Sequence, residues 1–244
     1  MTLARPERIA ASLLLFCFLG AVQGGNVPHL ISGDPHRNDL GFFDIHVCNW
    51  PERPQFLKVL FSTPRFAEID KMQVFDPDGR KIVELDKHHF MQLTPRDKPV
   101  KRVFMQDLDL PENIREGWYR IEVTDTRGQV HEARDMVPLT RIQRPQGLQP
   151  FDGEEDAPLA TGLSWQAVPG AQFYQVFLRD AWSDELLFRS KLIGETRTGL
   201  PPGTLKPGGY YVWRVHARDL NEHVLLGDFH NGSMSEKAYF SVRE

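Results

Sequence analysis

The feature that most constrains this chain is residues 205–217, where a Pro-Gly-Gly turn leads into a run of alternating side chains. Successive side chains of a strand point to opposite faces, so Tyr211, Trp213 and Val215 share one face. That face is aromatic and β-branched, as the buried side of a sheet requires. The opposite face, which includes Arg214, is mixed and can meet water. The stretch therefore predicts a β-strand with one side in a hydrophobic core.

Composition extends this prediction to the whole chain. Its 18 prolines and 19 glycines punctuate many short segments, which favours strands and turns over long helices. A hydrophobic content of 41% and a charged content of 25% are typical of a folded globular protein, and 244 residues are enough for two domains. The net charge of -4 gives no support to nucleic-acid binding, because proteins that bind nucleic acid usually carry a basic face.

Residues 1–24 have the pattern of a secretory signal peptide. Arg5 and Arg8 precede an apolar run, residues 9–19, that is too short to span a membrane as a stable helix. Small residues up to Gly24 then suit cleavage after that residue. No later stretch is apolar enough to cross a membrane. We therefore expect a periplasmic or secreted protein that does not span the membrane.

The chain has two cysteines, Cys17 and Cys48. Cys17 lies in the signal segment, and the bulky Phe16 before it is a poor match to the small residues that lipid attachment requires, so we expect no lipid anchor there. Removal of the signal leaves Cys48 alone, which excludes an intramolecular disulfide. Stability must then come from burial of a hydrophobic core, which a chain of this length can supply.

Residues 25–138 carry about seven short strand patterns separated by turns, which is the spacing of a β-sandwich. The Asp-Pro-Asp-Gly sequence at residues 76–79 is a strong hairpin signal, because proline presets φ and glycine takes the left-handed conformation. Residues 117–125 form the clearest strand of this half. Through that strand and Gly128, this half loosely resembles bacterial immunoglobulin-like domains, which implies the same sandwich fold.

Residues 139–157 separate the two halves and are rich in proline, which stiffens a linker. We interpret the acidic run at residues 152–156 as a solvated loop, since it lacks the ligand spacing of a recognisable calcium loop. The second domain is then predicted over residues 158–244.

The second half contains two connected patterns: a Trp followed by a Pro-containing turn and a Tyr-x-Val strand, and a later strand entered through Leu-x-Pro. The matching residues are Trp165, Pro169, Tyr174, Val176, Leu205, Pro207, Tyr211, Val215 and Ala217. On these residues this half resembles fibronectin type III domains. The resemblance implies a sandwich in which the Tyr211 hydroxyl bonds to nearby backbone and, by analogy, an interaction module. We predict an all-β protein of two tandem immunoglobulin-like or fibronectin type III-like β-sandwiches.

The chain lacks the common catalytic signatures. Gly-x-Ser-x-Gly and a Gly-rich phosphate loop are absent, and His131-Glu132 has no second histidine four residues on. Cys48 has His46 beside it but no sign of an oxyanion hole. We therefore predict a protein that is not an enzyme and needs no cofactor.

A soft-metal site is one alternative. His46 and Cys48 are two residues apart on a predicted strand and so face the same side. Thiolate and imidazole together suit Cu(I), and His88, His89 and Met91 lie in a later segment. The alternative to a metal site is a partly buried thiol with histidines on the surface.

Residues 219–235 form a long connection between the last two predicted strands, and long loops in compact domains are often functional. Its candidate binding residues are His223, Leu225, Phe229 and His230. These apolar and aromatic residues either meet a partner, as the end loops of sandwiches do, or fold back over the core.

Trp182 lies in a polar hairpin loop, and Trp50 lies beside Pro51. An exposed tryptophan can anchor a protein partner or stack on a sugar ring, and the alternative is that each ring folds over a neighbouring strand. The favoured hypothesis is an extracytoplasmic adaptor that binds another envelope or secreted protein. The alternatives are glycan binding at the cell envelope and periplasmic copper handling.

Overall fold

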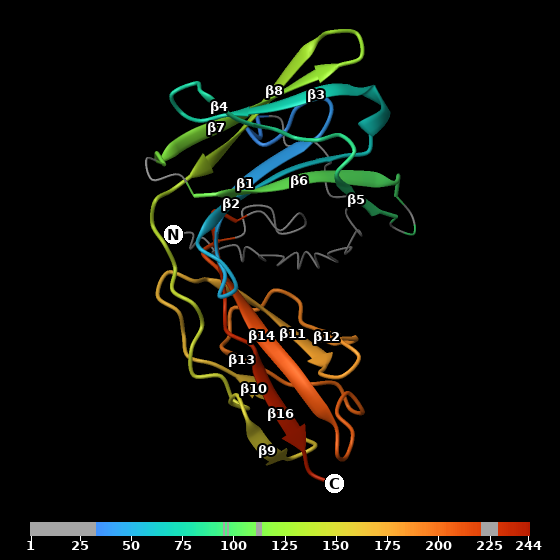
Figure 1. Ribbon diagram of the computed structural model, residues 1–244, viewed down its shortest axis with the longest axis vertical. Coiled ribbons are helices and arrows are strands. Elements are labelled where there is room, and N and C mark those ends of the chain that lie inside the picture. Colours follow the sequence, from blue (N-terminus) through green and yellow to red (C-terminus); the bar gives the residue numbers. More distant parts are fainter. Residues whose placement is uncertain (1–32, 95, 97, 111–113, 221–228) are drawn as a thin grey trace, which may run out of the picture. The chain divides into compact units, whose positions relative to one another are not determined.

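The structure, a computed structural model, describes residues 33–94, 96, 98–110, 114–220 and 229–244 (Figure 1). These residues form β-strands and one short 3-10 helix, η1 (Phe66–Glu68), with no α-helix among them. Two hydrophobic cores organise the strands, one built from residues 40–137 and the other from residues 142–242. We call the surrounding structures the N-terminal and C-terminal sandwiches. The all-β fold class with tandem sandwiches is confirmed. The predicted signal segment lies outside the described residues.

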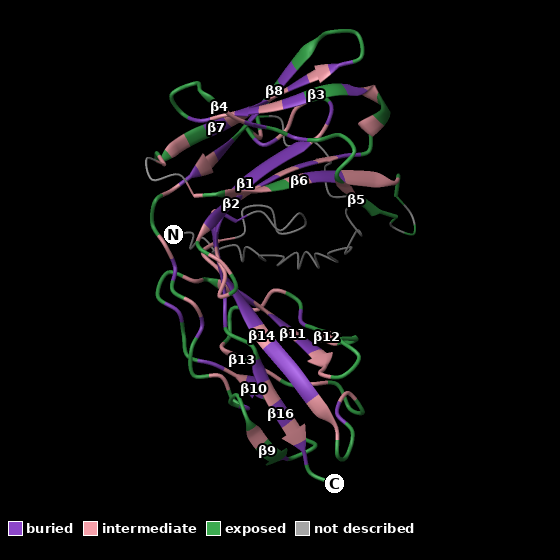
Figure 2. Cartoon of the chain, viewed as in Figure 1, coloured by how far each residue is buried: buried purple, intermediate pink, exposed green. Residues whose placement is uncertain are grey.

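The N-terminal sandwich has two four-stranded faces, in the orders β1-β2-β6-β5 and β4-β3-β7-β8. The strands are β1 (Phe42–Asn49), β2 (Phe56–Thr63), β3 (Ile69–Phe75), β4 (Lys81–Glu84), β5 (Phe90–Leu93), β6 (Lys101–Asp109), β7 (Gly117–Asp125) and β8 (Val130–Val137). Alternation explains the layering: on β7, Tyr119, Ile121 and Val123 are buried while the residues between them are not (Figure 2). The predicted turn joins β3 to β4, with Gly79 at a φ of 80°.

The C-terminal sandwich contains the remaining strands. They are β9 (Glu154–Ala157), β10 (Leu163–Ser164), β11 (Phe173–Asp180), β12 (Leu186–Arg189), β13 (Arg197–Thr198), β14 (Tyr210–Arg218), β15 (Asn231–Met234) and β16 (Ala238–Val242). The strand that the sequence predicted best, β14, is central: it pairs with β11 on one side and with β15 and β16 on the other. Its residues Tyr211, Trp213 and Val215 are buried as expected, but the opposite face is not wholly open to water, because Val212 and His216 are buried too.

The fibronectin type III resemblance also predicted the environment of Tyr211. The backbone N–H of Lys206 donates a hydrogen bond of 2.7 Å to the Tyr211 hydroxyl, which is the tyrosine corner expected there. The N-terminal sandwich has a comparable bond, in which the Tyr119 hydroxyl donates to the carbonyl of Arg115 at 3.1 Å. In both cases the hydroxyl forms a hydrogen bond with a backbone group that the turn would otherwise leave unpaired.

Two segments differ from the sequence prediction. The connection at residues 219–235 contains strand β15, because Asn231–Met234 finds a pairing partner on each side. The acidic run is not wholly a solvated loop, because Glu154–Ala157 forms β9 and pairs in parallel with β16. Burial of Ala157 in the C-terminal core draws this segment onto the sheet. The domain bounds 25–138, 139–157 and 158–244 stay a prediction.

Candidate functional site

Three aromatic side chains lie in a row on the C-terminal sandwich, and we call them the aromatic band: Trp182, Tyr210 and Tyr239. Trp182 comes from the hairpin between β11 and β12, Tyr210 opens β14, and Tyr239 lies on β16. The ring centroids of Trp182 and Tyr210 are 5.6 Å apart, and those of Tyr210 and Tyr239 are 6.0 Å apart. Trp182 is 83% exposed, whereas both tyrosines are half-buried. The band therefore has one exposed ring, that of Trp182, which lies next to two half-buried tyrosine rings.

The backbone under Trp182 is held in place by Asp180. One carboxylate oxygen of Asp180 accepts hydrogen bonds from the N–H of Trp182 at 3.0 Å and from the N–H and hydroxyl of Ser183 at 2.8 and 3.0 Å. The hydrogen bonds from Ser183 lower the pKa of Asp180, so the carboxylate stays charged. Ala181 donates its N–H to the carbonyl of Tyr210 at 3.0 Å. These hydrogen bonds therefore order the hairpin backbone without a partner.

The other candidate binding residues have different positions. His223 and Leu225 lie outside the described residues. Phe229 is buried, so its ring folds back into the protein instead of being free to meet a partner. The carbonyl of His230 accepts a hydrogen bond of 2.9 Å from the N–H of Val47. The described part of this connection therefore contacts the N-terminal sandwich instead of forming a free surface.

Strand β15 links the two sandwiches into one sheet. It pairs with β14 in antiparallel fashion and with β1 in parallel fashion, with Cys48 opposite Gly232. Residues 35–244 accordingly make one compact unit. At the end of β1, Arg144 donates hydrogen bonds to the carbonyl of Trp50 at 2.8 Å and to the side chain of Asn49 at 3.0 Å. The hydroxyl of Ser233 donates to the carbonyl of Gln143 at 2.7 Å.

Phe229 is the centre of a buried cluster at this junction. Its ring lies 4.0 Å from that of His46 and 5.3 Å from that of His216, and the guanidinium of Arg218 lies 4.7 Å from it. Gly232 makes room for the cluster, because a Cβ there would lie 2.6 Å from Nε2 of His216 and from the Phe229 ring. The cluster therefore packs the junction between the two sandwiches with buried side chains.

His46 and Cys48, the candidate metal ligands, both lie in this buried region. Nδ1 of His46 lies 3.1 Å from a carboxylate oxygen of Asp44. Burial alone would lower the pKa of His46, but the charges of Asp44 and Cys48 and the bonds to them raise it to about 10. Burial holds the pKa of His216 well below its usual value. Within the described ranges, no group of three His, Cys, Asp or Glu side chains could hold a metal ion.

Trp50 follows the alternative in which an aromatic ring folds over its neighbours. Its ring packs edge-on against Phe56 with centroids 5.1 Å apart, and the ammonium of Lys58 lies 5.3 Å above it. Of the two tryptophans considered for binding, only Trp182 offers an open face.

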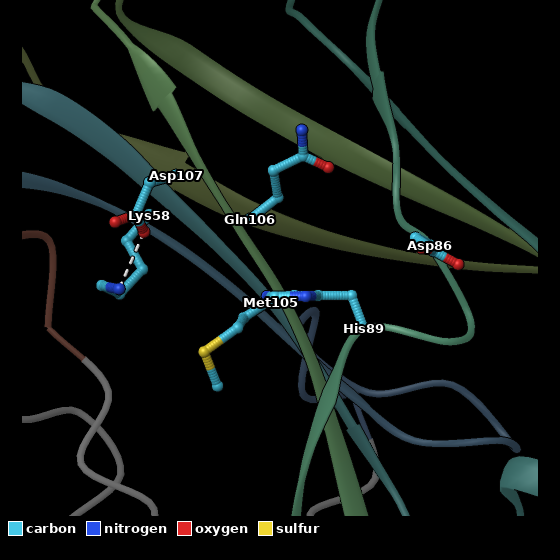
Figure 3. Close-up of a pocket in the computed structure, with 6 residues that line it drawn as sticks. All are labelled: Lys58, Asp86, His89, Met105, Gln106 and Asp107. Carbon is cyan, nitrogen blue, oxygen red and sulfur yellow. Dashed lines mark hydrogen bonds and ion pairs between the residues drawn. The ribbon is translucent and has the colours of Figure 1, made fainter.

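A depression on the N-terminal sandwich lies beside β6 (Figure 3). It is lined by Lys58, Asp86, His89, Met105, Gln106 and Asp107. The Lys58 ammonium donates to Asp107 at 2.7 Å, so this carboxylate is already paired. The lining residues include no hydroxyl or thiol nucleophile.

These observations define a class: an all-β protein of two tandem β-sandwiches, with an exposed tryptophan packed on two half-buried tyrosines of the second. No helix of the described residues is long and apolar enough to cross a membrane. No protein-family model matches the chain, and no curated protein matches its sequence.

Solved structures do match the chain, at low identity. The crystal structure of the FN1–FN3 domains of chicken CNTN1 matches with a TM-score of 0.31 and 12% identity, over 87% of this chain and 66% of that one. A tetra-tandem repeat in the extending region of a large adhesion protein matches with a TM-score of 0.27 and 12% identity, over 82% of this chain and 49% of that one. The chain therefore spans about two thirds of the length of the first structure and about half of the second.

Proposed function

We propose that this protein is an extracytoplasmic, non-enzymatic binding protein that recognises another envelope or secreted protein through its aromatic band. The observation that carries the proposal is the 83% exposure of Trp182 on a hairpin whose backbone is already fixed. Tryptophan and tyrosine dominate the energetic centres of protein interfaces, because they bury a large area at a low cost in conformational entropy. The extracytoplasmic location rests on the signal pattern of residues 1–24.

Binding would work by burial of the Trp182 ring in a pocket of the partner, while Tyr210 and Tyr239 support it from behind. Asp184 and Glu185, which are exposed and follow Trp182 in the same hairpin, would supply the polar rim of such an interface. The pinned hairpin reduces the ordering cost of association, because the loop has little freedom left to lose. Affinity is then concentrated in one side chain.

The test is a pull-down with tagged protein, residues 25–244, and its Trp182→Ala variant, using envelope extract of the source. We expect one partner near stoichiometry with the parent chain and at least about a tenfold loss with the variant, since loss of a central aromatic anchor costs about 2 kcal/mol or more. Trp118→Ala is the matched control, because Trp118 is 49% exposed but lies on β7 of the other sandwich. Equal capture by the parent and Trp182→Ala would refute the role of the band.

Glycan binding is the second candidate, and the row of three rings favours it, because the face of a sugar ring stacks on aromatic side chains. Titration with envelope oligosaccharides would then quench tryptophan fluorescence in the parent chain and not in Trp182→Ala. Saturable quenching of this kind without any captured protein would replace the protein partner by a glycan.

A further inference from the structure

We propose that the free edge of β5, on the N-terminal sandwich, binds an extended acidic peptide segment of a partner as an added β-strand. This site is separate from the aromatic band in both sequence and chemistry. Among the described strands, β5 pairs only with β6, so its other edge leaves alternate backbone N–H and C=O groups without a ladder partner. An extended peptide can satisfy these groups by continuing the sheet.

The side chains of β5 do not protect its edge. Met91 is 48% exposed and Leu93 is 41% exposed, and because they are two residues apart they lie on the same face. Natural edge strands are usually guarded by charged residues or proline on the strand itself, and Phe90–Leu93 has neither. An apolar side chain of an added strand can pack on this face.

The surface around the edge is basic, although the whole chain is acidic. Residues 86–102 contain five Lys and Arg and two Asp, whereas the net charge of the chain is -4. Arg96, Lys98, Lys101 and Arg102 are described, and none of them forms an ion pair with a described residue. Burial, together with repulsion from Arg37 and Lys98, lowers the pKa of Lys101. Basic residues outnumber acidic ones in this segment, and an acidic partner would supply the missing negative charge.

Arg102 is held in position for a carboxylate. Its guanidinium lies 4.0 Å from the ring centroid of Phe90 and 4.2 Å from that of Phe66, so two rings fix its plane. Its Nε is buried without a hydrogen-bond partner. Because Phe90 lies on β5 itself, the guanidinium reaches the edge strand, where a carboxylate on the next strand can accept two N–H bonds from it.

The register gives the pattern of the peptide. Met91 and Leu93 pair with Val103 and Lys101, whereas Phe90 and Gln92 pair with Phe104 and Arg102. One face of an added strand therefore meets apolar residues, and the other meets the Arg102 guanidinium. Alternation of apolar and acidic residues satisfies both faces.

Fluorescence anisotropy with a labelled Val-Glu-Val-Glu-Val-Glu-Val peptide tests this site on the chain of residues 25–244. We expect saturable binding that weakens as salt is added. We also expect at least about tenfold weaker binding by the Val-Lys version and by a peptide N-methylated at alternate positions, since the first reverses the charge and the second removes the ladder N–H groups.

The same titration with Arg102→Gln should weaken binding by about fivefold or more. The matched control is Arg189→Gln on β12, which is the edge strand at the other end of this sheet, and it should bind like the parent. Thermal midpoints confirm that each variant is folded. The proposal is overturned if the Val-Glu peptide does not bind, if the N-methylated or Val-Lys peptide binds equally well, or if Arg102→Gln and Arg189→Gln behave alike. Trp182→Ala should have no effect on this titration, so failure here leaves the aromatic band untouched.

Discussion

At the scale of single residues, the absence of one side chain decides how the junction packs. Gly232 lies opposite Cys48 in the sheet, and the rings of His216 and Phe229 occupy the space over it. Any β-carbon at this position would overlap both rings, since each would lie 2.6 Å away. The rings are buried and packed against each other, so neither can move aside without a cavity or a strained rotamer.

We therefore expect Gly232→Ala to lower the free energy of unfolding by about 1–3 kcal/mol through overpacking. Urea denaturation followed by circular dichroism measures it. Gly199→Ala is the control, because a Cβ there meets nothing within 4 Å. A Gly232→Ala variant as stable as Gly199→Ala would mean that the rings over Gly232 are not packed as described.

His46 gives a pH-dependent prediction. Its pKa is about 10 in the folded chain, above its ordinary value of 6.5, because Asp44 and Cys48 outweigh the effect of burial. The folded state therefore binds a proton that the unfolded state has released at neutral to alkaline pH. This contribution to stability is complete below about pH 6.5 and is lost as the pH rises toward 10.

Denaturant midpoints at a series of pH values between 6.5 and 9.5 measure this loss. Asp44→Asn removes the nearest negative charge, and we expect it to flatten the slope of stability against pH in this window. An unchanged slope in Asp44→Asn would show that His46 does not carry the titration.

At the scale of elements, β15 acts as a shared strand. It has a strand of the C-terminal sandwich on one side and β1 of the N-terminal sandwich on the other. Arg144, between β8 and β9, bonds through its guanidinium to Asn49 of β1 and to the carbonyl of Trp50, and it pairs with Glu236 just after β15 at 3.6 Å. The junction therefore depends on backbone pairing and on charged side chains, among them Arg144 and the ion pair between Arg214 and Glu52.

Replacement of Arg144 by Ala should cost about 1–3 kcal/mol, because two partly buried acceptors lose a charged donor. Arg134→Ala is the control, since its guanidinium pairs with Glu132 on the exposed face of β8. Faster amide exchange of β1 and β15 in Arg144→Ala than in Arg134→Ala is the expected readout. Equal amide exchange in both variants would mean that Arg144 does not stabilise the junction.

At the scale of the whole molecule, a continuous sheet predicts a single unfolding unit. The sheet that contains β14 reaches β2 and β6 through β15 and β1. Opening one sandwich removes pairing and buried surface from the other, so the two cores should unfold together.

Hydrogen exchange of the full chain in rising denaturant measures this coupling. We expect the most protected amides of β7 in the N-terminal core and β14 in the C-terminal core to merge into one opening free energy. Separate values with separate denaturant dependences would mean that the sandwiches unfold independently.

Local periodicity was enough to predict much of this protein. The alternation in residues 205–217 predicted β14 and its buried face, and the turn at residues 76–79 predicted the β3–β4 hairpin. The fibronectin type III resemblance predicted that the Tyr211 hydroxyl bonds to nearby backbone, and the partner is the N–H of Lys206. These features depend on neighbours a few residues away, and the chain encodes such neighbours directly through φ preferences and the period of two.

Tertiary structure alone decided the features on which function is proposed. Tyr210 and Tyr239 join Trp182 only because β14 and β16 pair, and nothing local marks either tyrosine as part of a band. Phe229 turns inward because β15 finds β1, a strand far away in the sequence. Whether a strand has one neighbour or two is likewise invisible in its own residues, so the open edge of β5 could not be predicted. Long-range strand pairing decides which side chains contact each other and which backbone groups stay unpaired. The alternation within one strand does not specify which other strand it pairs with.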